Sequence, residues 1–224
     1  MNDSAHIPLT DYTTFSQDTM IEKSQKFYEH MKTRHSIRSF SSKPVAKEII
    51  ENALLAAGTS PSGANHQPWH FVAISSNEVK QKVRQKAEEH EQKFYSGKTS
   101  KEWLDALKPL GTDANKPYLE IAPWLIAVFS QKTGGIDEGQ KKQNYYIHES
   151  VGIATGMLIT ALHTAGLATL THTPKPMTFL SEICNRPDNE RPYMLIIAGH
   201  PASNATIPAH AIKKKPLSSI STFL

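Results

Sequence analysis

The 224-residue chain has a single cysteine, Cys184, and so lacks the pair that an intramolecular disulfide needs. This scarcity is typical of a reducing compartment, where an isolated thiol is ordinarily buried. The polar N-terminus has neither the basic nor the apolar region of a signal peptide. The longest apolar run, residues 151–162, is interrupted by glycines and threonines and is too short to span a bilayer. We therefore expect a soluble, cytoplasmic protein without a membrane partner.

An excess of charge of one sign is also missing. The chain has 25 Lys and Arg against 21 Asp and Glu, a net charge of +4, and the signs alternate along it. A pI of about 9.0 mildly favours anionic ligands, but nothing indicates nucleic acid as a partner. Neither G-x-G-x-x-G nor a Walker loop occurs, which excludes dinucleotide and nucleotide-triphosphate sites of those types.

Histidines are present, but their spacing does not indicate a metal site. His66 and His70 are four residues apart, as in a helical zinc motif. Pro68 lies between them and prevents the helix that would bring the two imidazoles together. We predict no bound metal.

Hydrophobic periodicity predicts an α+β fold. Helices are expected over about residues 20–32, 46–57, 75–94, 145–165 and 178–184, and strands over 69–74, 124–129, 169–173 and 193–198. Capping boxes at Thr19 and Ser75 begin two helices, whereas Gly58 and Gly166 end two others. The elements follow no regular βαβ period, which argues against a doubly wound sheet. A polar stretch within about residues 88–120 is expected to form a lid.

A basic segment, Arg34-His35-Ser36-Ile37-Arg38, is the first candidate for chemistry. Its two arginines share one side at either helical or extended spacing, and Ser36 joins them if the chain is extended. Two guanidinium groups and a hydroxyl suit a phosphate. The alternative is a solvated basic turn.

The loop over residues 58–69 is the second candidate. Its prolines, glycines and small polar residues leave many backbone N–H groups available to a ligand. An ordinary helix-to-strand connection is the alternative.

Two further candidates carry polar groups at defined spacing. Glu91 and Tyr95 are four apart on one helical face, and Lys116 follows beyond the polar stretch; together they suit the zwitterion of an amino acid, or else mark an exposed helix face. The strand ending Thr171-His172-Thr173 brings hydroxyls that either donate to a ring nitrogen or cap the next turn.

Over about residues 20–217, these segments resemble the FMN-dependent nitroreductase superfamily. Residues 34–38 are similar to its R-R-S-x-R phosphate segment, and residues 61–64 with Pro68-Trp69 to its flavin loop. Within the superfamily the chain resembles the iodotyrosine deiodinase family, which has a Glu and a Tyr four apart and a Lys 21 residues further on. Glu91, Tyr95 and Lys116 keep both spacings. The chain departs from the family pattern at His35, His172 and Lys214, where Arg, Thr and Arg are usual, and its Asn65-His66-Gln67 is more similar to a generic nitroreductase than to an animal deiodinase.

The resemblance implies a nitroreductase-like domain over residues 1–224, with a mostly antiparallel sheet flanked by helices and a C-terminal extension at about 204–224. It implies an intertwined homodimer. It assigns the phosphate and ribityl end of FMN to Arg34, His35, Ser36, Arg38 and Lys214, and the flavin ring to Pro61, Ser62 and Gly63 of the other subunit. Thr173 would hydrogen-bond flavin N5 and act in catalysis, with Thr171 and His172 beside it. The substrate would be bound by Ala64, Glu91, Tyr95 and Lys116.

The implied reaction is reductive dehalogenation of 3-iodotyrosine and 3,5-diiodotyrosine by single-electron steps. Electrons would come from NAD(P)H or from a separate reductase as partner. A general FMN nitroreductase or quinone reductase working by hydride transfer is the alternative enzyme. A halotyrosine- or flavin-binding protein without catalysis is the alternative from another functional class.

Overall fold

The computed structural model describes residues 6–98, 102, 105, 107–137 and 139–224. Within it the chain forms two compact units, Met1–Arg34 and His35–Leu224. Parts of the polar stretch expected to form a lid, Trp103 and Leu104 among them, lie outside the described residues.

The first unit consists of an extended segment and helix α1 (Gln17–Lys32). The helix begins earlier than the sequence predicts, because the Ser16 hydroxyl accepts the Thr19 N–H at 3.3 Å and caps it. The prediction that a capping box at Thr19 begins this helix was therefore wrong. Helix α1 has no buried residue, and it exposes large hydrophobic side chains at Met20, Ile21, Phe27 and Tyr28.

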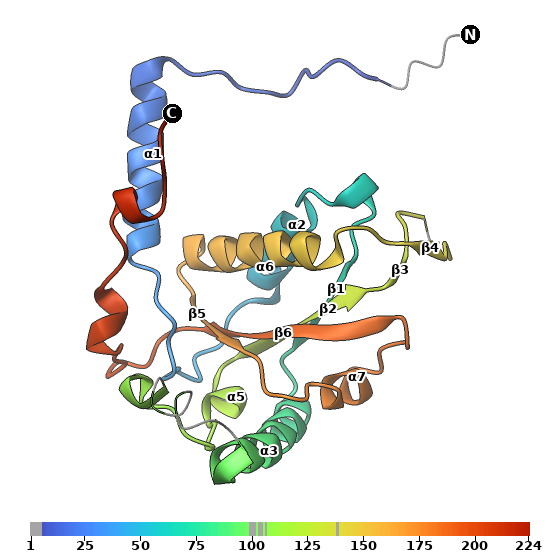
Figure 1. Ribbon diagram of the computed structural model, residues 1–224, viewed down its shortest axis with the longest axis vertical. Coiled ribbons are helices and arrows are strands. Elements are labelled where there is room, and N and C mark those ends of the chain that lie inside the picture. The colour runs from blue at the N-terminus through green and yellow to red at the C-terminus, as the bar shows by residue number, and fades with distance from the viewer. Residues whose placement is uncertain (1–5, 99–101, 103–104, 106, 138) are drawn as a thin grey trace. The chain divides into compact units, whose positions relative to one another are not determined.

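The second unit is built on a four-stranded sheet in the order β1-β2-β6-β5 (Figure 1). Its strands are β1 (Trp69–Ile74), β2 (Trp124–Gln131), β5 (Ala168–His172) and β6 (Glu190–Gly199). Every neighbouring pair is antiparallel. The sheet and its flanking helices confirm the predicted α+β class and antiparallel sheet.

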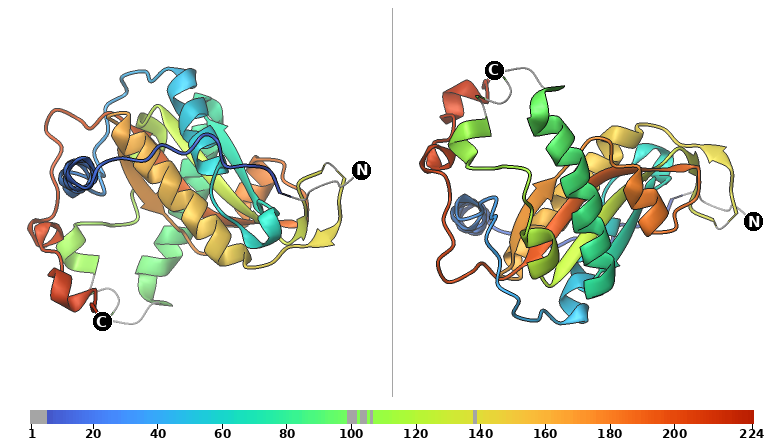
Figure 2. Two further views of the ribbon diagram at one scale, coloured as in Figure 1. Left: turned by 90° about the horizontal axis from the view of Figure 1, so that it is seen from above. Right: turned by 90° about the horizontal axis from the view of Figure 1, so that it is seen from below.

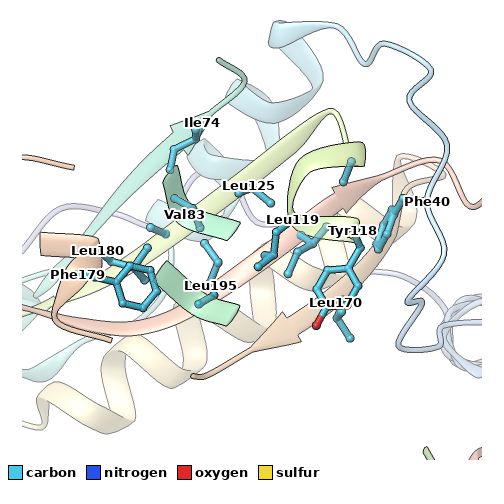
Figure 3. Packing of buried hydrophobic residues seen from close by; sticks show 14 of the residues in the cluster. Phe40, Ile74, Val83, Tyr118, Leu119, Leu125, Leu170, Phe179, Leu180 and Leu195 are labelled. Atoms are coloured by element: carbon cyan, nitrogen blue, oxygen red, sulfur yellow. The ribbon is translucent and has the colours of Figure 1, made fainter. Parts of the chain in front are cut away.

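Helices cover both faces of this sheet (Figure 2). Helices α2 (Lys47–Gly58) and α6 (Ile147–Thr164) pack on one face, and α3 (Asn77–Lys93), α5 (Tyr118–Ile121) and α7 (Phe179–Ile183) on the other. Strand β2, one of the two inner strands, is apolar on both sides, because alternate residues enter separate cores. Leu125 (Figure 3) and Phe129 join the core beneath α3, α5 and α7, and Ile126 and Val128 join the core beneath α2 and α6.

The helix ends show where local signals succeed. Gly166 adopts φ +84° just beyond α6, and its N–H donates to the His163 carbonyl, which confirms the prediction that this glycine ends the helix. Gly58, in contrast, lies inside α2, and Thr59 ends that helix. At α3 the cap is Ser76, whose hydroxyl accepts the Val79 N–H, one residue later than predicted.

The shortest elements were not predicted, because two to four residues cannot establish a period. They include the hairpin of β3 (Thr133–Gly134) and β4 (Lys142–Gln143) and the turns η1 (Gly63–Asn65), η3 (Lys108–Leu110), η4 (Ala209–Ile212) and η5 (Leu217–Ser219). A π-helical turn, η2 (Phe94–Lys98), continues α3. Among the described residues, no helix combines the length and apolarity needed to cross a membrane.

Candidate functional site

A cavity of about 570 Å³ lies where the C-terminal end of α3, the segment before α5 and the end of β5 meet. Its lining mixes aromatic and aliphatic groups with three cationic side chains (Arg38, Lys116 and Lys175), one carboxylate (Glu91) and several hydroxyls. Among the lining residues are Arg38, Glu91, Tyr95, Thr112, Lys116, Tyr118, Thr171, His172 and Thr173. Three of the four segments singled out in the sequence thus contribute to one cavity.

Lys116 is the centre of one wall of this cavity. The residue is only 2% exposed, although an ammonium group is rarely buried without partners. Its Nζ lies 3.4 Å from Glu91 Oε2 and donates to Thr112 Oγ1 at 3.0 Å and to the Asp113 carbonyl. It also lies 5.6 Å from the centre of the Tyr95 ring. Glu91, Tyr95 and Lys116 are therefore neighbours in the structure.

Helical spacing explains how this wall is formed. Glu91 lies on α3 and Tyr95 on the turn η2 that continues it, so both side chains project from nearly the same face. The Tyr95 hydroxyl donates to the Thr112 carbonyl at 3.2 Å and so ties the returning segment to the helix. Lys116 then enters from the far end of the polar stretch.

Burial controls the electrostatics of the same wall. It raises the pKa of the Glu91 carboxyl above its usual value, although the Lys116 ammonium acts in the opposite direction. Burial also raises the pKa of the Tyr95 phenol, which stays protonated at neutral pH. Lys116 therefore compensates only part of the cost of burying the Glu91 charge, and an additional cation beside Glu91 would stabilise its charged form further.

The end of β5 forms another part of the lining. Thr171 is exposed, His172 is buried, and Thr173 follows at the end of the strand. The Nε2 atom of His172 is buried and has no hydrogen-bond partner in the described part of the chain. Burial, with a smaller effect of Lys116, lowers the pKa of His172 to about 3, so the ring is neutral at pH 7.

The basic segment is divided by the structure. Ser36 pairs with Thr169 beside β5, and the Ile37 N–H donates to the Thr169 carbonyl at 3.1 Å. This extended conformation places Arg38 in the cavity lining. Arg34 belongs to the first unit, and neither His35 nor Lys214 is among the lining residues. Lys214 Nζ donates to the Ala211 carbonyl instead.

The loop of Pro61, Ser62, Gly63 and Ala64 does not line this cavity. It leads into η1, which follows α2 at the end of the sheet away from α5 (Figure 1). Its backbone is fixed: Ser62 Oγ accepts the Gln67 N–H at 2.9 Å, and the Gly63 N–H donates to Ser150 Oγ at 3.4 Å. A Cβ at Gly63 would lie 2.7 Å from the Tyr145 carbonyl oxygen, so only glycine fits there.

The groups at the β5 end fit the flavin expected from the sequence. The Arg38 guanidinium has no hydrogen bond or ion pair with any described residue and is available to a phosphate. The unpartnered His172 Nε2 and the hydroxyls of Thr171 and Thr173 supply polar contacts for a ring system. Across the described residues, no group of three or more His, Cys, Asp or Glu side chains is arranged to hold a metal ion.

Sequence reasoning missed Thr112 and Tyr118 as cavity residues. Thr112 is the acceptor for both Tyr95 and Lys116, through its carbonyl and its hydroxyl. Tyr118 lies edge-on to His172, with ring centroids 6.0 Å apart. Their closeness in the chain to Lys116 is a usable signal, but it becomes informative only once Lys116 is known to be buried.

Comparison with known proteins gives consistent matches. Residues 31–200 match the model of the nitroreductase family. The chain is 48% identical to an iodotyrosine deiodinase of Haliscomenobacter hydrossis over 87% of each chain. It is 40% identical to iodotyrosine deiodinase 1 of Homo sapiens, over 96% of this chain and 74% of the human one. A crystal structure of oxidized iodotyrosine deiodinase bound to FMN and 3-iodo-L-tyrosine superposes with a TM-score of 0.73 at 28% identity, covering 88% of this chain and 100% of that one.

Proposed function

The chain belongs to the nitroreductase family and, within it, to the iodotyrosine deiodinases, and we infer that it removes iodide from halotyrosines with FMN as its cofactor. The substrates are 3-iodotyrosine and 3,5-diiodotyrosine. In each turnover a ring C–I bond breaks and a C–H bond forms, two electrons and one proton are taken up, and iodide leaves. Bound FMN supplies the electrons.

The observation that carries this function is the buried ion pair of Lys116 and Glu91 in the same cavity as Thr173. We propose that the substrate's carboxylate forms an ion pair with Lys116 and that its ammonium forms one with Glu91. The Tyr95 hydroxyl would also contact this amino-acid group. Ion pairs are stronger where water is excluded, so a buried pair selects an amino acid over a simple phenol. Because Lys116 compensates only part of the cost of burying the Glu91 charge, the positive charge of the substrate's ammonium group would be favoured beside it.

The lining near β5 would hold the cofactor. Arg38, with Ser36 and His35 near it in the chain, would bind the FMN phosphate. Arg34 and Lys214 would supply further positive charge for that phosphate. Thr173 would donate a hydrogen bond to flavin N5, a contact that suits single-electron chemistry, with Thr171 and His172 adjacent. The backbone of Ala64 would receive the substrate's phenolate.

A homodimer would complete this site. The loop of residues 61–64 lies outside the cavity of its own chain, and helix α1 leaves Phe27 and Tyr28 exposed. Leu55 on α2 and Ile153 on α6 are likewise 70% and 46% exposed. We propose that two chains associate through such apolar surfaces and that each supplies Pro61, Ser62, Gly63 and Ala64 to its partner's flavin site.

The electrons for the cofactor would come from outside the chain, which lacks a G-x-G-x-x-G motif. We propose NAD(P)H, used directly or through a separate reductase. Incubating the purified FMN enzyme with NADPH and 3-iodotyrosine separates the two, because only direct use consumes NADPH without an added reductase.

Iodide release tests the function. The dithionite-reduced FMN enzyme should release iodide from 3-iodotyrosine, and Lys116→Ala should reduce kcat/KM by about 100-fold or more, the value of a buried charge-assisted contact. Lys108→Ala removes an exposed lysine that lies outside the cavity lining and should change little.

Two outcomes would contradict this function. Full nitroaromatic turnover with no iodide release, in wild type and Lys116→Ala alike, would indicate a general nitroreductase. A protein that binds 3-iodotyrosine but releases no iodide would be a binding protein without catalysis.

A further inference from the structure

Outside the cavity, Arg84 on α3 holds three side chains at once. Its Nε donates to Glu88 Oε1 at 2.9 Å, its Nη1 to Glu120 Oε2 at 2.9 Å and its Nη2 to Asn115 Oδ1 at 3.0 Å. The acceptors come from α3, from α5 and from the chain between η3 and α5. We call Arg84 and these three partners the Arg84 clamp.

The clamp reaches Lys116 through the backbone. Glu88 Oε1, which accepts from Arg84, also accepts the main-chain N–H of Lys116 at 2.6 Å. Asn115, held by Arg84 itself, is the residue directly before it. Two successive residues of the returning segment are thus fixed to one turn of α3.

The geometry of the helix makes this anchor relevant to the cavity. Glu88 and Glu91 are three residues apart on α3 and lie on the same side of it. The first fixes the backbone of Lys116, and the second lies 3.4 Å from its Nζ. Arg84 itself is not among the residues that line the cavity. An effect of Arg84 on a ligand there must therefore pass through the clamp.

The type of residue at position 84 supports a positioning role. A guanidinium has a fixed planar arrangement of donors, so three acceptors bound to it are held in a defined relation. A lysine has one donor atom and cannot reproduce that arrangement. The side chains of Arg84, Glu88 and Glu120 are 29%, 22% and 33% exposed, so solvent only partly screens them.

We propose that the Arg84 clamp is a positioning device for halotyrosine binding, which fixes the backbone at Lys116 and so places its ammonium for the substrate's carboxylate. This inference rests on the proposed function. It makes the clamp important for ligands with an amino-acid group and unimportant for ligands without one. The FMN end of the cavity should not depend on it.

A double-mutant cycle on the FMN-loaded enzyme tests the proposal. Arg84→Met should weaken 3-iodotyrosine binding, followed by quenching of flavin fluorescence, by about tenfold, the equivalent of about 1.4 kcal/mol. The affinity for 2-iodophenol, which has no amino-acid group, should not change. In a Lys116→Ala background, Arg84→Met should have little further effect on 3-iodotyrosine.

Three comparisons keep the result interpretable. Arg84→Lys should give intermediate binding, and Arg191→Met, which removes an exposed arginine, should resemble wild type. Asn115→Ala removes one acceptor of the clamp and should also weaken the binding of 3-iodotyrosine. It replaces Arg84→Met in the test if that variant does not fold.

The proposal would be overturned by equal weakening of the binding of both ligands, or by the same loss of 3-iodotyrosine binding with and without Lys116. A wild-type enzyme that binds no 3-iodotyrosine would contradict the proposed function itself. Wild-type binding that survives Arg84→Met and Asn115→Ala unchanged would contradict only the clamp.

Discussion

At one end of the cavity, Lys116 Nζ has polar neighbours in Glu91, Thr112 and Asp113 of its own chain. At the other end, the Arg38 guanidinium and His172 Nε2 have no hydrogen-bond partner among the described residues. The first end lies on one helix and the segment that returns to it. The second combines β5 with residues near position 38, and the loop of residues 61–64 lies elsewhere.

This contrast distinguishes two ways of building a site. The substrate end is organised before any ligand arrives, so its groups need only exchange one partner for another when the substrate binds. At the flavin end, His172 Nε2 is buried without a hydrogen-bond partner among the described residues. A buried polar atom without a partner, such as His172 Nε2, is costly, which favours binding of the cofactor at this end.

The largest expected effect is restoration of activity by mixing two inactive proteins. Gly63→Ala should disrupt the flavin loop, because the added Cβ would lie 2.7 Å from the Tyr145 carbonyl oxygen. Lys116→Ala should inactivate the substrate end. In a mixed dimer, one site would combine an intact loop from one chain with an intact Lys116 from the other.

Iodide release by co-refolded mixtures, compared with each variant refolded alone, measures this effect. Failure to recover activity in isolated mixed dimers would show that the loop serves its own chain.

The next effect concerns Glu91. Glu91→Gln keeps the size of the side chain but removes the charge that would meet the substrate's ammonium. We expect about 10- to 100-fold weaker binding of 3-iodotyrosine, typical of a charge-assisted contact. Glu89→Gln, on the exposed side of α3, is the matched control and should change binding less than twofold. Equal effects of the two substitutions in fluorescence titrations would show that Glu91 does not bind the substrate.

Arg38 should affect the cofactor and leave the substrate contacts in place. Arg38→Ala should weaken FMN binding by roughly tenfold or more, since a guanidinium–phosphate contact contributes about 1.5–3 kcal/mol. Reconstitution of apoprotein with FMN, measured by fluorescence, gives the dissociation constant. Arg191→Ala is the control. Unchanged FMN affinity would mean that other cations bind the phosphate.

The last effect, on stability and not on binding or activity, is the pH dependence that arises from His172. Its pKa is lowered to about 3 in the folded state, whereas the unfolded chain titrates near pH 6.5, so stability falls as the pH falls through 6.5 toward 3. Between pH 7 and pH 5 this amounts to about 2 kcal/mol. Urea unfolding of wild type and His172→Gln should show that difference in pH dependence, while His210→Gln, at an exposed position, should behave as wild type. A wild-type pH dependence retained in His172→Gln would contradict this assignment.

The sequence predicts the sheet and the long helices well, because their hydrophobic periods extend over several turns or alternations. It predicts Glu91 and Tyr95 on one face for the same reason. Other features depend on contacts between distant residues, such as the burial of Lys116 and the separation of residues 61–64 from the cavity. Helix caps were displaced by one to three residues where neighbouring serines and threonines offered equivalent local signals.

The most direct test compares 3-iodotyrosine with 2-iodophenol on the FMN enzyme and on Lys116→Ala. Both ligands carry the same iodinated phenol, and only the first carries the amino-acid group that the buried pair would bind. We expect that wild type prefers 3-iodotyrosine by about 100-fold or more and that Lys116→Ala abolishes most of this preference. A preference that is equally large in Lys116→Ala would contradict the role given to the Lys116–Glu91 pair.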